Sequence, residues 1–238
     1  MPEVTEEIQS IDLRRRPQPE EGPLDIIYED DWMLVANKPA GIVVHPTYKN
    51  TSGTLLNAVL WRVRERPGSQ PGILTRLDKD TSGLVVIALT PDVHATMQKH
   101  AAAGRTTKHY LAVVVGSPEP SEGTIVLPLA RDPGDRRRVV VTPEGAPCET
   151  RYEVLSTRAD HSIVRCELVT GRTHQIRVHL AARGWPILGD RVYGAPDDRI
   201  TRQALHAWRV SLPHPITRDA LNFEAPIPAD MCQFCEGV

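Results

Sequence analysis

Residues 76–89 read RLDKDTSGLVVIAL, a polar stretch that runs directly into six apolar residues. The apolar part, Leu84 to Leu89, has the length and the Val and Ile content of a buried strand. No apolar run in the chain exceeds six residues, far below the roughly 20 that a membrane helix needs. The polar part predicts a loop between buried strands, a good position for a catalytic carboxylate. An ordinary turn, with Asp80 or Thr81 bonded to nearby backbone, is the competing interpretation.

Strand and helix patterns extend outward from this stretch in both directions. Short apolar runs predict strands at 26–28, 33–36, 42–44, 73–77, 109–115, 124–127, 138–141, 150–156, 162–168, 205–212 and 221–224. Helical spacing predicts helices over 51–66, 90–104 and 173–182, the last with Thr173 as its cap and Gly184 at its end. Many strands with three helices predict an α+β fold on a largely antiparallel sheet.

The length of 238 residues predicts one large domain or two small ones, with a polar segment at each end of the chain. Residues 1–24 are charged and interrupted by prolines, which predicts a flexible arm, and residues 229–238 are expected to form a tail. Residues 1–31 hold ten acidic and three basic residues, a net charge of −7, whereas residues 32–238 hold 20 acidic and 25 basic ones, a net charge of +5. The arginine-rich body suits recognition of phosphate, although a GC-rich genome produces the same excess.

Cysteine usage and the first residues bear on the compartment and on metals. Four cysteines in 238 residues do not make a disulfide scaffold, and the start MPEVTEEIQS lacks the features of a signal peptide. We therefore expect a cytoplasmic protein with no membrane association. Cys232 and Cys235 have no second pair nearby, and His174 and His179 are five residues apart, so no metal site is expected.

A second polar cluster, GRTHQIRVH at 171–179, opens the helix predicted over 173–182. In that position Arg172 and Arg177 lie near the backbone N–H groups of the helix start. They can there hold a carboxylate or a phosphate. A solvated helix face is the competing interpretation for both arginines.

Taken together, these motifs resemble the RluA family of RNA pseudouridine synthases. RLDKDTSG followed by LVVIAL is similar to the family signature. Further blocks match the family in the same order, over about residues 25–228: EDDWMLVANKPAGIVVHP, TTKHYLAVVVG, LVTGRTHQIRVHLAARGWPILGDRVYG, LHAWRVSLPHP and FEAPIP. Five ordered blocks make a chance match improbable.

The resemblance implies a single catalytic domain over residues 25–228 with the pseudouridine synthase fold, a bent mixed sheet with flanking helices. It also implies isomerisation of a specific uridine in structured transfer or large-subunit ribosomal RNA. The reaction breaks the bond from ribose to base nitrogen and rejoins the base through carbon, so it needs no cofactor. Asp78 matches the family nucleophile, and Arg177 matches the arginine expected to form a bidentate pair with it. Tyr110 matches the tyrosine whose ring can stack on the base and whose hydroxyl can carry a proton.

RNA contacts are expected from the catalytic domain itself, acting as a monomer. Arg76 matches a family arginine that fills the space left by a flipped base, and Arg172 and His174 are expected to contact RNA as well. Thr75 stands where family members usually have His, which bears on substrate choice. The acidic arm is too short for a separate RNA-binding domain and repels RNA. The remaining candidates, with a solvated hairpin tip as the alternative, are Arg131, Arg136, Arg137 and Arg138.

Two other functions fit part of the sequence. The tetrapeptide DKDT at 78–81 matches the DxDT pattern of haloacid dehalogenase phosphatases, which depend on Mg²⁺. That pattern belongs at the end of an apolar parallel strand, whereas Thr75 and Arg76 interrupt the strand here. The other alternative, a non-catalytic RNA-binding module of the same fold, would lack the aspartate, tyrosine and arginine named above, and all three are present.

Overall fold

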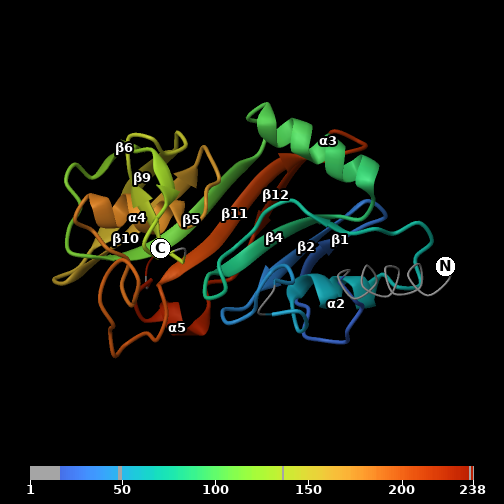
Figure 1. The fold of residues 1–238 in the computed structure, drawn as a ribbon, viewed down its shortest axis with the longest axis horizontal. Helices are drawn as coiled ribbons and strands as arrows, with labels where there is room; N and C mark the ends of the chain where they lie inside the picture. Colours follow the sequence, from blue (N-terminus) through green and yellow to red (C-terminus); the bar gives the residue numbers. More distant parts are fainter. Residues whose placement is uncertain (1–16, 48–49, 136, 236, 238) are drawn as a thin grey trace, which may run out of the picture.

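The computed structural model describes residues 17–47, 50–135, 137–235 and 237. One long bent sheet runs through both halves of the molecule, with helices packed against it (Figure 1). Its strand order is β1-β2-β4-β11-β5-β10-β9-β6, with β12 beside β11 and β3 beside β4, and β7 and β8 form a separate hairpin. The α+β prediction is therefore confirmed.

The strands of the first half are β1 (Ile26–Glu29), β2 (Met33–Lys38), β3 (Gly72–Ile73) and β4 (Ser82–Ala88). Those that follow are β5 (Thr107–Val115), β6 (Glu122–Val126), β7 (Leu129–Arg131), β8 (Val139–Val141), β9 (Glu149–Thr157), β10 (His161–Leu168), β11 (Leu205–Pro213) and β12 (Ala220–Glu224). Among the described strands, β4 and β11 are the one parallel pair. This pair joins the two halves of the sheet.

A glycine allows β4 and β11 to approach closely at this junction. Gly83 has φ +110°, and a Cβ added there would lie 2.2 Å from the carbonyl oxygen of Ala207. No other residue fits a positive φ and such a contact at once. The turn that carries Asp78 is thereby fixed at the centre of the sheet.

Helices cover both faces of the first half, which explains why its central strand is apolar throughout. α2 (Leu55–Arg62) packs on one face of β2 and β4, and α3 (Pro91–Ala102) packs on the other. Thr90 caps α3 ahead of Pro91, as predicted. In the second half α4 (Gln175–Ala182) packs against β8 and β9, and its Ile176 and Leu180 belong to the apolar core of that half. A short helix, α5 (Ala229–Cys232), follows β12.

Two local predictions are wrong because side chains and turns take over the backbone hydrogen bonds. Residues 42–44 are not a strand: the carbonyls of Val43 and Val44 accept from the first amides of α2 instead. The strand predicted over 73–77 ends at Ile73, because the Thr75 hydroxyl accepts the Val86 N–H at 2.9 Å in place of a strand carbonyl. Thr75 thus completes the pairing of β4.

The described parts of the two end segments contact the domain. Within residues 17–24, Glu20 donates its N–H to the carbonyl of Asn57 in α2, and Leu24 packs against the core. Residues 1–16 of the expected arm lie outside the described residues. At the other end, Met231, Phe234 and Cys235 are buried in the core of the second half.

Candidate active site

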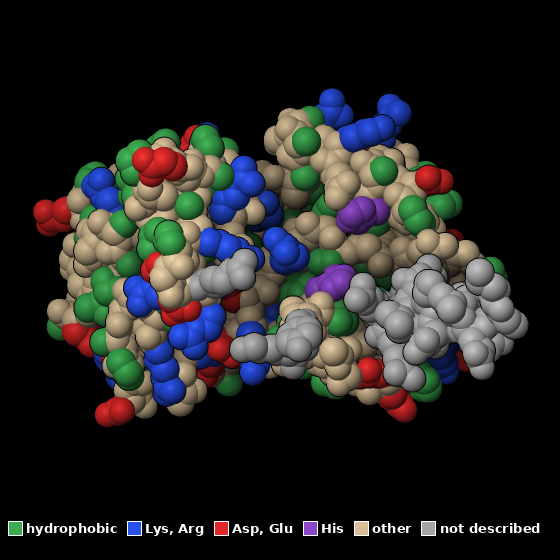
Figure 2. All heavy atoms as spheres, in the orientation of Figure 1, with side chains coloured by type: hydrophobic (Ala, Val, Ile, Leu, Met, Phe, Trp, Pro, Cys, Tyr) green, Lys and Arg blue, Asp and Glu red, His purple; other side chains and the backbone are tan. Residues whose placement is uncertain are grey.

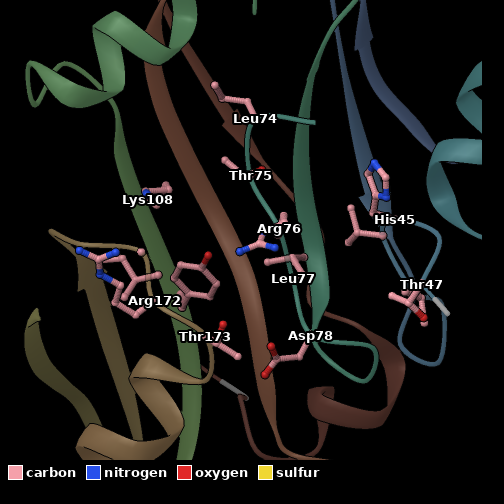
Figure 3. Close-up of a pocket in the computed structure, with 15 residues that line it drawn as sticks. His45, Thr47, Leu74, Thr75, Arg76, Leu77, Asp78, Lys108, Arg172 and Thr173 are labelled. Carbon is pink, nitrogen blue, oxygen red and sulfur yellow. The ribbon is translucent and has the colours of Figure 1, made fainter. Parts of the chain in front are cut away.

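A cavity of about 320 Å³ opens where the two halves of the sheet meet. Its walls come from the loop before β4, from β5 and from the loop before α4, which contribute Arg76, Asp78, Lys108, Tyr110 and Arg172 (Figure 3). Residues separated by almost 100 positions in the sequence are thus brought together by the sheet. The cavity is the place where the predicted site residues converge.

Asp78 lines this cavity and forms a hydrogen-bonded ion pair with a buried arginine, Arg177. The Arg177 Nη1–H donates to Oδ2 of Asp78 at 2.9 Å. The rest of the Arg177 guanidinium binds Asp190, with Nε to Oδ2 at 2.7 Å and Nη2 to Oδ1 at 2.9 Å. The predicted bidentate pair between Asp78 and Arg177 is therefore wrong, because the two-point partner is Asp190. Asp78 receives one N–H and keeps Oδ1 without a hydrogen bond or ion pair among the described residues.

The ion pair below Asp78 is buried. The Asp190 side chain is fully enclosed and that of Arg177 is 6% exposed, against 25% for Asp78. Burial alone would raise the pKa of Asp190, but Arg177 and two backbone N–H donors outweigh it and the pKa is lowered. Burial would likewise lower the pKa of Arg177, but Asp190 and then Asp78 raise it. Arg177 is therefore charged at all working pH values.

His174 borders Asp78 from the start of α4. It is the N-cap residue in a left-handed conformation, φ 56°, so the predicted Thr173 cap is wrong. This conformation places Nε2 at 3.7 Å from Oδ2 of Asp78, while Nδ1 is 2.8 Å from the Tyr193 hydroxyl. The same hydroxyl accepts the Val139 N–H at 2.8 Å, which links His174 to the β7–β8 hairpin. Burial lowers the pKa of His174 despite the nearby Asp78, so the ring is neutral at pH 7.

Tyr110 projects from β5 into the same cavity and is 6% exposed. Burial first, and then the charge of Asp78, raise the pKa of its hydroxyl well above the ordinary value. The phenol therefore keeps its proton at working pH. Among the described residues it has no hydrogen-bond partner, so its O–H is available to a molecule in the cavity.

Two buried cations support the loop that carries Asp78. Lys38, at the end of β2, is fully buried and donates from Nζ to the carbonyls of Pro39, Ile42 and Lys79 at 2.7 to 2.9 Å. Burial lowers the pKa of Lys38 to about 8, although the negative charge of Asp80 acts to raise it. Arg202 donates to the Asp80 carbonyl at 3.1 Å and binds Asp230 with two N–H groups. The carbonyls of the two residues that directly follow Asp78 are thereby fixed.

The predicted RNA contacts divide into two groups. Arg76 and Arg172 are exposed and line the cavity. The backbone N–H of Arg172 donates to Gln175 Oε1 at 3.0 Å, which fixes the loop. In the space-filling view, Lys and Arg side chains gather beside the hollow between the two halves (Figure 2). These two arginines are therefore placed to meet a negatively charged molecule.

The arginines of the β7–β8 hairpin are placed differently. Arg137 forms a two-point surface ion pair with Asp135, so its charge is already compensated. Arg138 lies over the Tyr193 ring, with Cζ 5.5 Å from its centroid, and Arg131 is exposed nearby. Arg136 lies outside the described residues. Arg138 thus contacts Tyr193, and the charge of Arg131 acts on the pKa of His174, so both arginines lie close to the site.

The site residues that the sequence did not predict are mostly those that form hydrogen bonds or ion pairs with the predicted ones and fix their positions. Asp190, Tyr193 and Arg202 lie within segments quoted for the resemblance or close to them, but nothing in their local pattern indicates burial. Lys38 did leave a signal, because alternation puts it on the same strand face as Leu34 and Ala36, both fully buried. A charged residue on a buried face indicates a supporting or functional role.

The fold and the cavity together define a class of protein: an enzyme that presents one oxygen of an anchored carboxylate to a ligand bound among cations and a protonated phenol. The family model "RNA pseudouridylate synthase" matches residues 32–182. Ribosomal large subunit pseudouridine synthase D of Nitrosomonas europaea is 42% identical over 231 residues, 93% of this chain and 67% of that protein. An uncharacterized RNA pseudouridine synthase of Bacillus subtilis is 42% identical over 221 residues, 90% of this chain and 73% of that protein.

A solved structure, human RNA pseudouridylate synthase domain containing 1, agrees. It superposes with a TM-score of 0.70 at 28% identity, covering 87% of this chain and 86% of that one. The chain belongs to the RNA pseudouridine synthase family, and it is an isomerase that converts uridine to pseudouridine in RNA. The phosphatase alternative fails on topology, since Asp78 precedes β4 instead of following a strand in a parallel sheet. None of the described helices is long and apolar enough to cross a membrane.

Proposed function

We propose that the RNA is large-subunit ribosomal RNA and that Asp78 is the residue that attacks the ribose. The proposal for the RNA rests on the relative of Nitrosomonas europaea, whose name assigns it to the large ribosomal subunit. The proposal for Asp78 rests on one observation: Oδ2 is held by Arg177 while Oδ1 stays open to the cavity. We further propose that the enzyme works as a cytoplasmic monomer.

The proposed reaction uses the open carboxylate oxygen at the anomeric carbon. As the bond from C1′ to N1 breaks, its electron pair leaves with the uracil. Asp78 then forms a bond to C1′, stabilises the sugar as a cation, or takes the C2′ proton to leave a glycal. The base turns and C5 bonds to C1′ while the bond to Asp78 breaks or, from the glycal, while C2′ regains its proton. C5 then loses its proton to solvent and N1 gains one, which restores the Asp78 carboxylate. Tyr110 lines the same cavity and keeps its proton, which supports a role in holding the base and in passing a proton.

The other residues of the site have two proposed roles, positioning Asp78 and binding the RNA. Arg177 and Asp190 fix the orientation of Asp78, while Lys38 and Arg202 fix its loop. Arg76 and Arg172 at the cavity mouth bind the RNA beside the flipped nucleotide. A fixed nucleophile is what this reaction requires, because small displacements of a reacting group cost large factors in rate.

The test is to map pseudouridine in cellular RNA from cells with and without this protein. We expect a large-subunit ribosomal position to lose its modification and to regain it when the gene is restored. A position lost in transfer RNA instead would replace the proposed substrate. An unchanged map in both RNA classes would refute the proposal.

A further inference from the structure

Lys108 is an unusual cation in this structure. It lies on β5 two residues before Tyr110, so both side chains are on one face of the strand, and both line the cavity of Asp78. Six of the described lysines and arginines are not exposed, and five of them have partners within the chain: Lys38, Arg66, Arg165, Arg177 and Arg202. Lys108 is the sixth, and no described residue forms an ion pair or hydrogen bond with it.

A partly buried ammonium group without a partner is unfavourable unless an anion reaches it from outside. Burial lowers the pKa of Lys108, and no charged group offsets that effect. Arg76 and Arg172, on the same cavity, likewise have no carboxylate within ion-pair distance in the described part of the chain. The cavity therefore offers uncompensated positive charge above Asp78.

The positions of these cations limit what the anion can be. Lys108 and Arg172 lie beside each other on one wall, with Arg76 and Asp78 across the cavity (Figure 3). The Lys108 Nζ lies near Gly171, where an added Cβ would be 3.7 Å away. In RNA, a ribose bound at Asp78 is joined to one phosphodiester through its 5′ oxygen and to another through its 3′ oxygen. Because Asp78, Lys108 and Tyr110 line one cavity, a phosphodiester that flanks this ribose is the anion closest to the reaction that can meet Lys108.

We infer that Lys108, with Arg172 beside it, is a binding site for the RNA phosphodiester adjacent to the target uridine. The inference rests on the proposed function for the identity of the sugar at Asp78. Its consequence is that part of the binding energy comes from the backbone of the nucleotide that reacts. A nucleotide held at its phosphate also has its anomeric carbon positioned against Asp78.

The experiment measures binding of a fluorescent uridine decamer across salt concentrations. Lys108→Met removes the charge and keeps an apolar stem, and Lys99→Met on the exposed face of α3 is the matched control. Losing one phosphate contact flattens the logarithmic salt slope by about 0.7 for a single strand. We expect this change, and a loss of about tenfold in affinity, in Lys108→Met only. Lys108→Arg should restore the slope, which separates lost charge from a misfolded protein.

Two further arms identify the source of the phosphate. A decamer whose linkages are neutral methylphosphonates should bind the parent and Lys108→Met equally. Equal slopes for Lys108→Met and the parent, or loss of the methylphosphonate decamer's affinity in Lys108→Met, would overturn the inference. Displacement of the decamer by millimolar inorganic phosphate at constant ionic strength, in the parent alone, would also overturn it in favour of a free-phosphate site. Binding is measured without turnover, so a failure to form pseudouridine would count against the proposed function and not against this site.

Discussion

Replacing Asp190 by Asn removes the charge from the most deeply buried carboxylate of the site while keeping its size. In the parent, both carboxylate oxygens accept from Arg177, and Oδ1 also accepts the backbone N–H of Val192 and of Tyr193. An amide has one acceptor oxygen and one donor nitrogen. At least one N–H of Arg177 would therefore face another donor inside a region that excludes water.

The structure sets the size of the effect. Removing one partner of a buried ion pair costs about 3–5 kcal/mol, and the remaining amide oxygen favours the lower end, about 3 kcal/mol. The matched control is Asp197→Asn, whose carboxylate forms the same two-point pair with Arg199, at the surface. Urea unfolding should show a large loss of unfolding free energy for Asp190→Asn and little change for the control, because solvent screens the surface pair.

The same substitution changes the response to acid. The pKa of Asp190 in the folded protein lies below its ordinary value of 3.8. A lowered folded pKa adds stability above the unfolded pKa, and that stability is lost as the pH falls through the folded pKa. Between pH 7 and strong acid, Asp190→Asn should therefore lose less stability than the parent. A variant with the parent's urea midpoint and acid response would refute the assignment of Asp190 as the main partner of Arg177.

Three further substitutions test other parts of the site. Arg177→Lys keeps the charge but cannot bind Asp190 and Asp78 in one plane, so single-turnover pseudouridine formation should fall by about 100-fold; a parental rate would contradict this. Tyr110→Phe keeps the ring and removes the proton, and we expect a rate loss of about 100-fold, whereas a near-normal rate would leave only a packing role. Gly83→Ala should lower thermal stability far more than Gly104→Ala, since both have positive φ but only the first meets backbone; equal losses would count against the close approach of β11.

Much of the fold follows from the sequence because its patterns are local. The apolar run at 84–89, the cap at Thr90 and the positive φ of Gly184 each depend on neighbouring residues, and each is found where predicted. Residues 42–44 are apolar enough for a strand. Their carbonyls are used by α2 instead, and only the tertiary arrangement shows this.

The sequence predicted those site residues that belong to a recognisable motif. It did not predict which residue pairs with which, because the folded arrangement decides that. The resemblance brought Asp78 and Arg177 together, and the structure places them 2.9 Å apart. Asp190 lies 13 residues after Arg177, beyond the end of α4, and no helical or strand spacing relates the two. The left-handed backbone of His174 is equally invisible, since a non-glycine residue seldom adopts it.

The most direct test of the account is single-turnover pseudouridine formation by purified Asp78→Asn, on the RNA that the cellular map identifies. Asp80→Asn is the control, because its side chain lies on the turn two residues away. We predict no product above background for Asp78→Asn, with RNA affinity and unfolding midpoint close to those of the parent, and a far milder loss for Asp80→Asn. Substantial turnover by folded Asp78→Asn would contradict the central claim that this carboxylate attacks the ribose.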